Sequence, residues 1–217
     1  MMMKNYKILL LNSDCLVQPD TLAACNATNF DVVGCRLTDA NGKTIQSTGY
    51  FPTLRRVTQL MLFIDNFPVI RKFIDTIHIR DTSRLSKTHR IDWIQGAFMM
   101  LKKEVYRKVG GFDENFHMYG EEVEWCYRIK KSGYKVCYYP EVKVMHLKGA
   151  SGVGITSGLK EEYKSLLFFY KKHMPVWKIP ILIFLLKIGA MLRIFLFGII
   201  YPDPRKKKIY EEAFRLV

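Results

Sequence analysis

The chain has 217 residues, of which 49% are hydrophobic and 25% charged. This composition can build one domain, or one domain plus an appendage, and it excludes a disordered tail, a collagen-like fibre and a small disulfide scaffold. The formal net charge of +14 indicates an anionic partner or surface. The five cysteines form no CxxC pair and no signal peptide is visible at the N-terminus, so we interpret the cysteines as reduced thiols in a cytosolic compartment.

The first part of the chain alternates short apolar runs with turn residues. Residues 6–11 are an apolar run without helical spacing and predict a fully buried strand. A short helix is expected over 19–28 and a second strand over 31–37. Residues 55–77 combine large apolar and basic side chains, with only Pro68 as a breaker, and predict two short helices.

The second part of the chain continues this alternation. The expected strands are 91–101, which contains a glycine, and 134–139 and 141–147, which Pro140 separates. The expected helices are 103–109, 120–132 and 159–172, and a loop of small residues is expected over 149–158. Strands that alternate with helices predict an α/β layer architecture.

The end of the chain is both its most apolar and its most basic part. The last sixty residues contain twelve Lys and Arg against five Asp and Glu, and the basic cluster 205–208 follows the apolar run 179–201. This run is long enough to span a bilayer, but Lys187 and Arg193 lie near its middle and cations flank both of its ends. We therefore expect an interfacial or re-entrant helix pair, hinged near Gly189, on an anionic membrane surface. A buried hydrophobic hairpin is the alternative, and no nucleic-acid partner is expected because no binding signature accompanies the charge.

Three polar positions stand at the ends of predicted elements, where α/β sheets place their ligands. Asp14 follows the first strand, Glu121 and Glu122 open a helix, and His146 ends the last strand on its inward face. Taken singly, these residues could be a turn residue, acids that complement a helix dipole and a core histidine. Taken together, a carboxylate and an imidazole suit Mg²⁺ or Mn²⁺ carrying a phosphate substrate. A separate carboxylate can then accept a proton from an attacking hydroxyl.

The order of these residues resembles a known family. Residues 7–16 read KILLLNSDCL, and residues 91–151 contain W-x-x-G-A, G-G-F-D-E-x-F, Y-G-E-x-V-E-x-C-x-R and H-x-x-G-A-S. Over roughly residues 4–173 the chain is similar to family 2 glycosyltransferases of the GT-A fold, in their bacterial rhamnosyltransferase-like branch. The resemblance implies a partial GT-A (Rossmann-like) mixed sheet with flanking helices over 1–173, and a membrane-associating apolar and basic tail over 174–217.

The resemblance also implies a role for each candidate residue. Asn12-Ser13-Asp14 matches the D-x-D-type motif, with Asn in place of its first acid. Asn12 and Asp14 would therefore bind the donor diphosphate and its divalent cation, and His146 would complete the metal site. Glu122 would be the general base, with Glu121 as the reserve. The residues on the acceptor side would be Trp93, Gly96, Ala97 and Asp113.

The implied activity is the inverting transfer of a sugar from a nucleotide-diphosphate donor to a lipid-linked or polysaccharide acceptor in cell-surface glycan synthesis. It would take place at the cytoplasmic face of the plasma membrane. Family members carry several βα units before the strand that leads to the D-x-D motif, whereas Asp14 lies close to Met1. We therefore expect the chain to be the C-terminal portion of a transferase that lacks its nucleotide-binding part. The alternative is a non-catalytic remnant, or a membrane-bound partner module, of such an enzyme.

Overall fold

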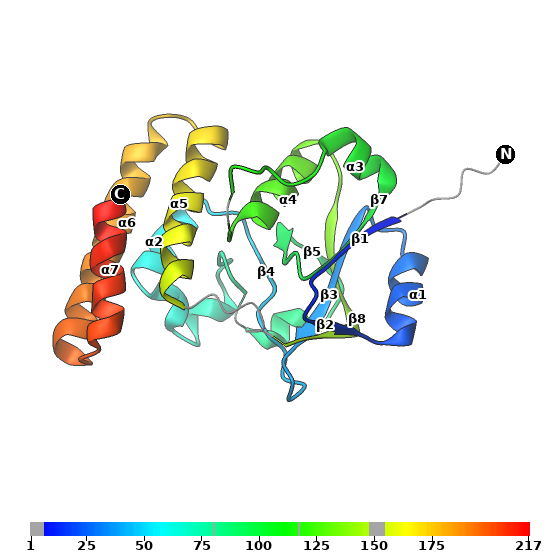
Figure 1. Cartoon of the computed structure of the whole chain (residues 1–217), viewed down its shortest axis with the longest axis horizontal. Coiled ribbons are helices and arrows are strands. Elements are labelled where there is room, and N and C mark those ends of the chain that lie inside the picture. Colours follow the sequence, from blue (N-terminus) through cyan, green and yellow to red (C-terminus); the bar gives the residue numbers. More distant parts are fainter. Residues whose placement is uncertain (1–6, 80, 117, 148–154) are drawn as a thin grey trace. The chain divides into compact units, whose positions relative to one another are not determined.

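The computed structural model describes residues 7–79, 81–116, 118–147 and 155–217 (Figure 1). The chain divides into two compact units. The sheet unit consists of Met1–Phe51, His78–Asp113 and Glu122–Ser151. The helical unit consists of Pro52–Ile77, Glu114–Glu121 and Gly152–Val217.

The sheet unit contains a six-stranded mixed sheet with the strand order β1-β7-β3-β8-β2, and β5 also pairs with β8. The parallel pair is β3 with β8, and the other pairs are antiparallel. Two short strands, β4 and β6, pair separately. The strands are β1 (Lys7–Leu11), β2 (Cys15–Val17), β3 (Val32–Thr38), β4 (Thr48–Gly49), β5 (His89–Arg90), β6 (Trp93–Ile94), β7 (Phe98–Lys102) and β8 (Val136–His146).

Helices pack on both faces of this sheet. On one face, Val32 and Leu101 join a core with Trp125 and Ile129 of α4. On the other face, the next residue along, Val33, joins a core with Cys25 of α1. Adjacent strand residues point to opposite faces, so strands covered on both sides are apolar almost throughout. The helices of this unit are α1 (Pro19–Ala27), α3 (Lys103–Val109), α4 (Glu121–Lys131) and the 3₁₀ segment η3 (Thr82–Leu85).

The helical unit is a group of helices in which α6 packs against α2, α5 and α7. Its helices are α2 (Leu54–Met61), the 3₁₀ segments η1 (Ile64–Asn66) and η2 (Ile70–Lys72), α5 (Ile155–His173), α6 (Lys178–Phe195), the π-helical turn η4 (Leu196–Ile200) and α7 (Pro204–Leu216). The stretch Lys178–Ile200 is apolar and long enough to cross a membrane, and 22% of it is buried within the protein.

The two cations near the middle of the apolar stretch, Lys187 and Arg193, both make contacts within the helical unit itself. Arg193 is 9% exposed and donates to the carbonyl oxygens of Leu60 (2.8 Å) and Met61 (2.9 Å), at the C-terminal end of α2. Its guanidinium also lies over the Phe63 ring at 4.0 Å. Lys187 lies over the Phe214 ring at 5.3 Å. A cation at a helix C-terminus complements the helix dipole, so Arg193 ties α6 to α2.

The predicted α/β architecture with a mixed sheet and flanking helices is confirmed, and three local predictions are wrong. The strand expected to be fully buried is half-buried, because β1 pairs only with β7 among the described strands. The strand expected over 91–101 is interrupted at residues 95–97, between β6 and β7. The two strands expected on either side of Pro140 are one strand, β8. Its register against β3 shifts between Cys35 and Arg36, a bulge that accommodates a residue without a backbone N–H.

The predicted hinge near Gly189 is also wrong, because α6 runs through this residue without a break. A Cβ atom at Gly189 would lie 2.3 Å from the Met61 sulfur, so glycine lets α6 approach α2 closely. The helix pair instead divides at residues 201–203, where Asp203 caps α7 and Pro204 begins it. The loop expected over 149–158 ends earlier than predicted because α5 begins at Ile155, and residues 149–154 lie outside the described residues.

Candidate functional site

The strand pairing of β2 with β8 places residues near Asp14 beside the end of β8. In this antiparallel register Cys15 is directly opposite His146. The backbone carbonyl of Asp14 accepts a hydrogen bond from the Leu147 N–H at 2.9 Å, so Asp14 and Leu147 form a hydrogen-bonded pair of the ladder. The next pair, Cys15 and His146, is therefore a non-hydrogen-bonded pair, in which the two residues lie closer together. The side chains of such a pair project from the same face of the sheet. The fold therefore directs Cys15 and His146 toward one point.

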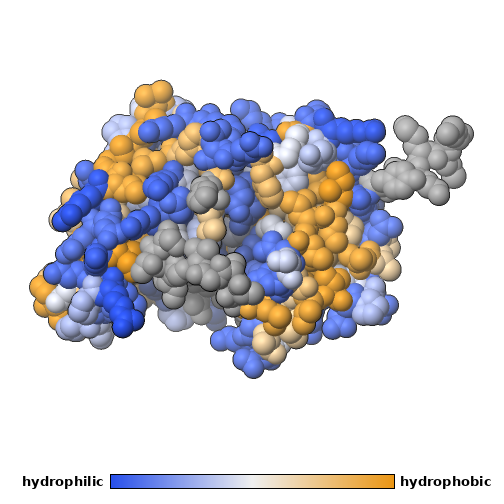
Figure 2. Space-filling view, in the orientation of Figure 1, coloured by the Kyte–Doolittle hydropathy of each residue, from blue (hydrophilic) through white to orange (hydrophobic). Residues whose placement is uncertain are grey.

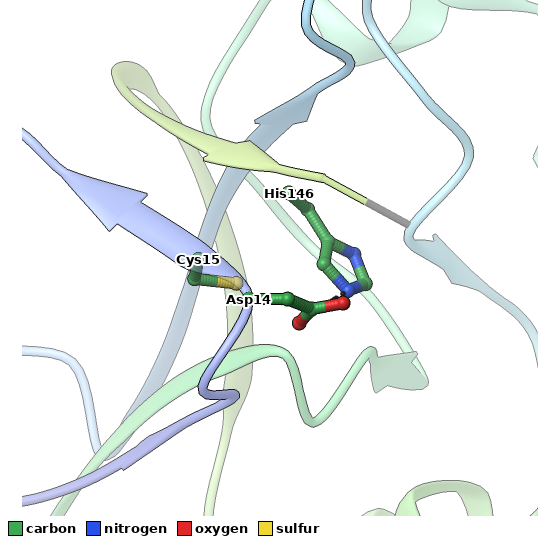
Figure 3. A group of neighbouring side chains, drawn as sticks. All are labelled: Asp14, Cys15 and His146. Atoms are coloured by element: carbon green, nitrogen blue, oxygen red, sulfur yellow. Dashed lines mark ion pairs between the residues drawn. The ribbon is translucent and has the colours of Figure 1, made fainter. Parts of the chain in front are cut away.

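The carboxylate of Asp14 and the imidazole of His146 lie against each other at this point (Figure 3). The Asp14 Oδ1 atom lies 3.2 Å from the His146 Nε2 atom, and the two side chains are 14% and 6% exposed. The Nδ1 atom of His146 is buried and has no hydrogen-bond partner among the described residues. The predicted proximity of an early aspartate and a late histidine is therefore confirmed for these two residues.

The third member of this group is Cys15, and we define Asp14, Cys15 and His146 as the Asp–Cys–His cluster. One ligand atom from each residue lies within 4.8 Å of the other two. The Cys15 thiol donates to the Ala97 carbonyl at 3.4 Å. Burial, together with the negative charge of Asp14, raises the pKa of Cys15 from 9.0 to about 11, so the group is a neutral thiol at pH 7.

The acid pair lies in the first turn of α4, as predicted. The chain enters this helix through two left-handed residues, Tyr119 (φ 62°) and Gly120 (φ 99°). A Cβ atom at Gly120 would lie 3.0 Å from the Ser165 Cβ atom, so both space and backbone conformation favour glycine there. Glu121 and Glu122 are each partly buried. Glu121 belongs to the helical unit and Glu122 to the sheet unit, and the approach of either carboxylate to the Asp–Cys–His cluster stays a prediction.

The predicted donor and acceptor residues differ in how they relate to the cluster. The Ala97 carbonyl accepts from both the Asn12 N–H (3.0 Å) and the Cys15 thiol, so Ala97 lies beside the cluster. Asn12 is exposed.

Trp93 is 4% exposed and its ring packs edge-on against His78 in the core. A Cβ atom at Gly96 would lie 3.7 Å from the Phe112 ring, and Asp113 follows this ring in the chain.

A structural role of α4 was not predicted from the sequence. Arg128 pairs with the fully buried Glu124, with 2.9 Å from its Nε atom to each carboxylate oxygen. It also donates to the carbonyls of Val109 and Gly111, at 2.6 Å each. The Trp125 indole donates to the intervening Gly110 carbonyl at 2.7 Å. Helix α4 therefore fixes the backbone that leads to Phe112 and Asp113. In the sequence, only the i,i+4 spacing of Glu124 and Arg128 could have indicated this ion pair.

Comparisons with known proteins identify the family that this chain resembles. A model of the glycosyltransferase-like family 2 matches residues 2–161. The N-acetylglucosaminyl-diphospho-decaprenol L-rhamnosyltransferase of Mycobacterium tuberculosis (strain H37Rv) is 33% identical over 101 residues, which are 45% of this chain and 33% of the relative. Rhamnosyltransferase WbbL of Escherichia coli (strain K12) is 30% identical over 90 residues, 38% of this chain and 34% of the relative. The chain thus spans about one third of the length of these curated relatives.

A solved structure with a distant likeness is the crystal structure of GalNAc-T7 with UDP, GalNAc and Mn²⁺. It is 16% identical with a TM-score of 0.45, and the match covers 96% of this chain and 39% of that one.

Proposed function

The chain belongs to the family 2 glycosyltransferases, and from that premise we propose that it takes part in the inverting transfer of a sugar from a nucleotide-diphosphate donor to a lipid-linked or polysaccharide acceptor. The observation that carries the proposal is the Asp14–His146 pair, 3.2 Å apart at the ends of strands of a mixed sheet. A carboxylate and a buried imidazole in contact can hold a divalent cation that neutralises a diphosphate. The rhamnosyltransferase names of the relatives support this substrate class.

The residues of the cluster fit a divalent cation. Asp14 offers a carboxylate oxygen and His146 a ring nitrogen, and the buried Nδ1 atom of His146 has no hydrogen-bond partner among the described residues. A cation bound there would supply positive charge that stabilises the departing nucleoside diphosphate. Asp14 and His146 would hold Mg²⁺ or Mn²⁺, and Asn12 would contact the donor from the exposed side of the same turn.

The proton of the acceptor hydroxyl needs a separate base. We assign this role to Glu122 in the first turn of α4, with Glu121 as the reserve. One displacement at the anomeric carbon, with the proton passing to this carboxylate, inverts the configuration. A retaining enzyme with a covalent intermediate would need a nucleophile close to the sugar. The backbone held by Arg128 and Trp125 would keep Asp113 on the acceptor side of the site.

The helical unit would bring this chemistry to an anionic membrane surface. Large apolar side chains follow one exposed stripe at helical spacing along α6 and the residues that flank it. Figure 2 shows hydrophobic surface near the turn between α5 and α6. The stripe consists of Trp177, Ile181, Phe184, Met191, Phe195 and Ile199. Arg193 and Lys187 are engaged within the unit, so the outward face of α6 is left apolar. Residues 205–208 add exposed cations next to it. We infer an interfacial helix on the cytoplasmic leaflet.

Metal-dependent donor hydrolysis by the full chain tests the proposed function. UDP-, GDP- and dTDP-sugars are incubated with Mn²⁺, and release of the nucleoside diphosphate is followed. We expect release from one of the donors, and its loss in Asp14→Ala and in Glu122→Gln. Asp20→Ala, an exposed aspartate in the first turn of α1, is the matched control and should behave as the unaltered chain. Equal turnover in Asp14→Ala, or no release from any donor, would contradict the proposal.

A further inference from the structure

The Asp–Cys–His cluster contains a donor that the proposed Mg²⁺ or Mn²⁺ chemistry does not use. The Cys15 sulfur lies within 4.8 Å of a ligand atom of both Asp14 and His146. Figure 3 shows the thiol directed toward the Asp14 carboxylate. Because Cys15 and His146 are cross-strand partners, strand pairing holds this proximity.

The three atoms are an oxygen, a nitrogen and a sulfur. Mg²⁺ takes oxygen ligands in an octahedral shell, whereas Zn²⁺ takes mixed oxygen, nitrogen and sulfur ligands in a tetrahedron. Two tetrahedral ligands at about 2.0–2.1 Å from Zn²⁺ lie roughly 3.3 Å apart, close to the 3.2 Å between Asp14 and His146. Three protein ligands with the fourth position open is also the usual arrangement of catalytic zinc.

The cluster combines a buried imidazole with a partly exposed thiol. His146 is 5% exposed and its Nε2 atom faces the Asp14 carboxylate. Cys15 itself is only partly buried, whereas Cys25, Cys35, Cys126 and Cys137 are buried. Among the described residues, Asp14, Cys15 and His146 are the one such group of ligands.

We propose that Cys15 is a third metal ligand, and that it makes this site select a thiophilic divalent ion such as Zn²⁺ or Cd²⁺ over Mg²⁺. As the sulfur–metal bond forms, the thiol proton leaves to the buffer and the Ala97 carbonyl loses its sulfur donor; no electron is transferred. The fourth position is left for an oxygen of the donor diphosphate. This last step rests on the proposed function, but the binding of the ion does not.

Cadmium titration of the full chain tests the proposal without any sugar donor. A cadmium–thiolate bond gives an ultraviolet charge-transfer band, and proton release is recorded in weak buffer at the same time. We expect a band that saturates at one ion per chain and persists in excess Mg²⁺. Cys15→Ser should abolish the band and weaken Cd²⁺ binding by roughly tenfold or more, since even outer-shell partners contribute about 10–100-fold. Cys25→Ser, which removes a buried thiol of α1 from the core against which Cys15 packs, should keep the band.

A measurement on the unaltered chain guards against a variant that fails to fold. Alkylation of Cys15 by N-ethylmaleimide, mapped by mass spectrometry, should slow at least severalfold with Zn²⁺ and be unaffected by Mg²⁺. A band that survives Cys15→Ser, or alkylation that Zn²⁺ does not slow, would overturn the proposal. A Cys15-dependent band without donor hydrolysis would contradict the proposed function alone. Mg²⁺-supported hydrolysis without such a band would overturn the role of Cys15 alone.

Discussion

Loss of the Arg128 guanidinium should lower the free energy of unfolding of the sheet unit by more than the loss of an exposed charge does. In Arg128→Met the carboxylate of Glu124, which is fully buried, loses the guanidinium that pairs with it. The carbonyls of Val109 and Gly111 lose their donors in the same step. Breaking a buried ion pair from one side costs about 3–5 kcal/mol. We therefore expect the free energy of unfolding to fall by about 3–5 kcal/mol, a large part of a typical domain's stability.

Urea unfolding followed by tryptophan fluorescence measures this loss. Trp125 is 1% exposed and donates to Gly110 beside the altered site, so it reports directly on this region. Lys164→Met is the matched control, because Lys164 and Glu161 form an exposed helix pair and its loss should change stability by about 0–1 kcal/mol. The double variant Glu124→Leu/Arg128→Met removes the buried carboxylate together with its guanidinium and should regain much of the loss. A change below about 1 kcal/mol in Arg128→Met would refute the reasoning.

Three further predictions concern other parts of the chain. Gly189→Val should lower the free energy of unfolding of the helical unit by about 1–3 kcal/mol in thermal or urea unfolding, because the added Cβ would meet Met61. Gly198→Ala is the control and should change this free energy little, because a Cβ there would make only ordinary contacts. Equal effects of the two substitutions would contradict the close packing of α6 on α2. Replacing Phe184 and Phe195 together by serine should reduce sedimentation with anionic vesicles without a change in thermal stability, and undiminished sedimentation would contradict an interfacial α6. Because the pKa of Cys15 is raised to about 11, its alkylation rate should still increase between pH 9 and pH 11 by mass spectrometry, whereas a plateau near pH 9 would contradict the burial of the thiol.

The sequence predicted the positions of most helices and strands but not their partners. Period-two alternation placed His146 on the inward face of its strand, and the family motif singled out Asp14, so their meeting could be predicted. The contribution of Cys15 depends on the antiparallel register of β2 against β8, which no local pattern in a three-residue strand specifies.

The remaining differences come from tertiary contacts. Pro140 was expected to end a strand, but a shift in register against β3 keeps β8 continuous. Gly189 was expected to be a hinge, yet it is a point of close contact between α6 and Met61. Arg193 was counted against a bilayer span of its helix, and in the structure it donates to the carbonyls at the end of α2. Each outcome depends on a partner more than forty residues away in the chain.

The binding of one cation by Asp14 and His146 together is the central claim, and electron paramagnetic resonance of free Mn²⁺ tests it most directly. Titration of the full chain should reveal one bound ion, with affinity reduced by roughly tenfold or more in Asp14→Ala and in His146→Ala, and unchanged in Asp20→Ala. The double variant should bind no more weakly than the poorer single variant, since both residues serve the same ion. Unchanged Mn²⁺ affinity in both single variants would contradict a shared metal site.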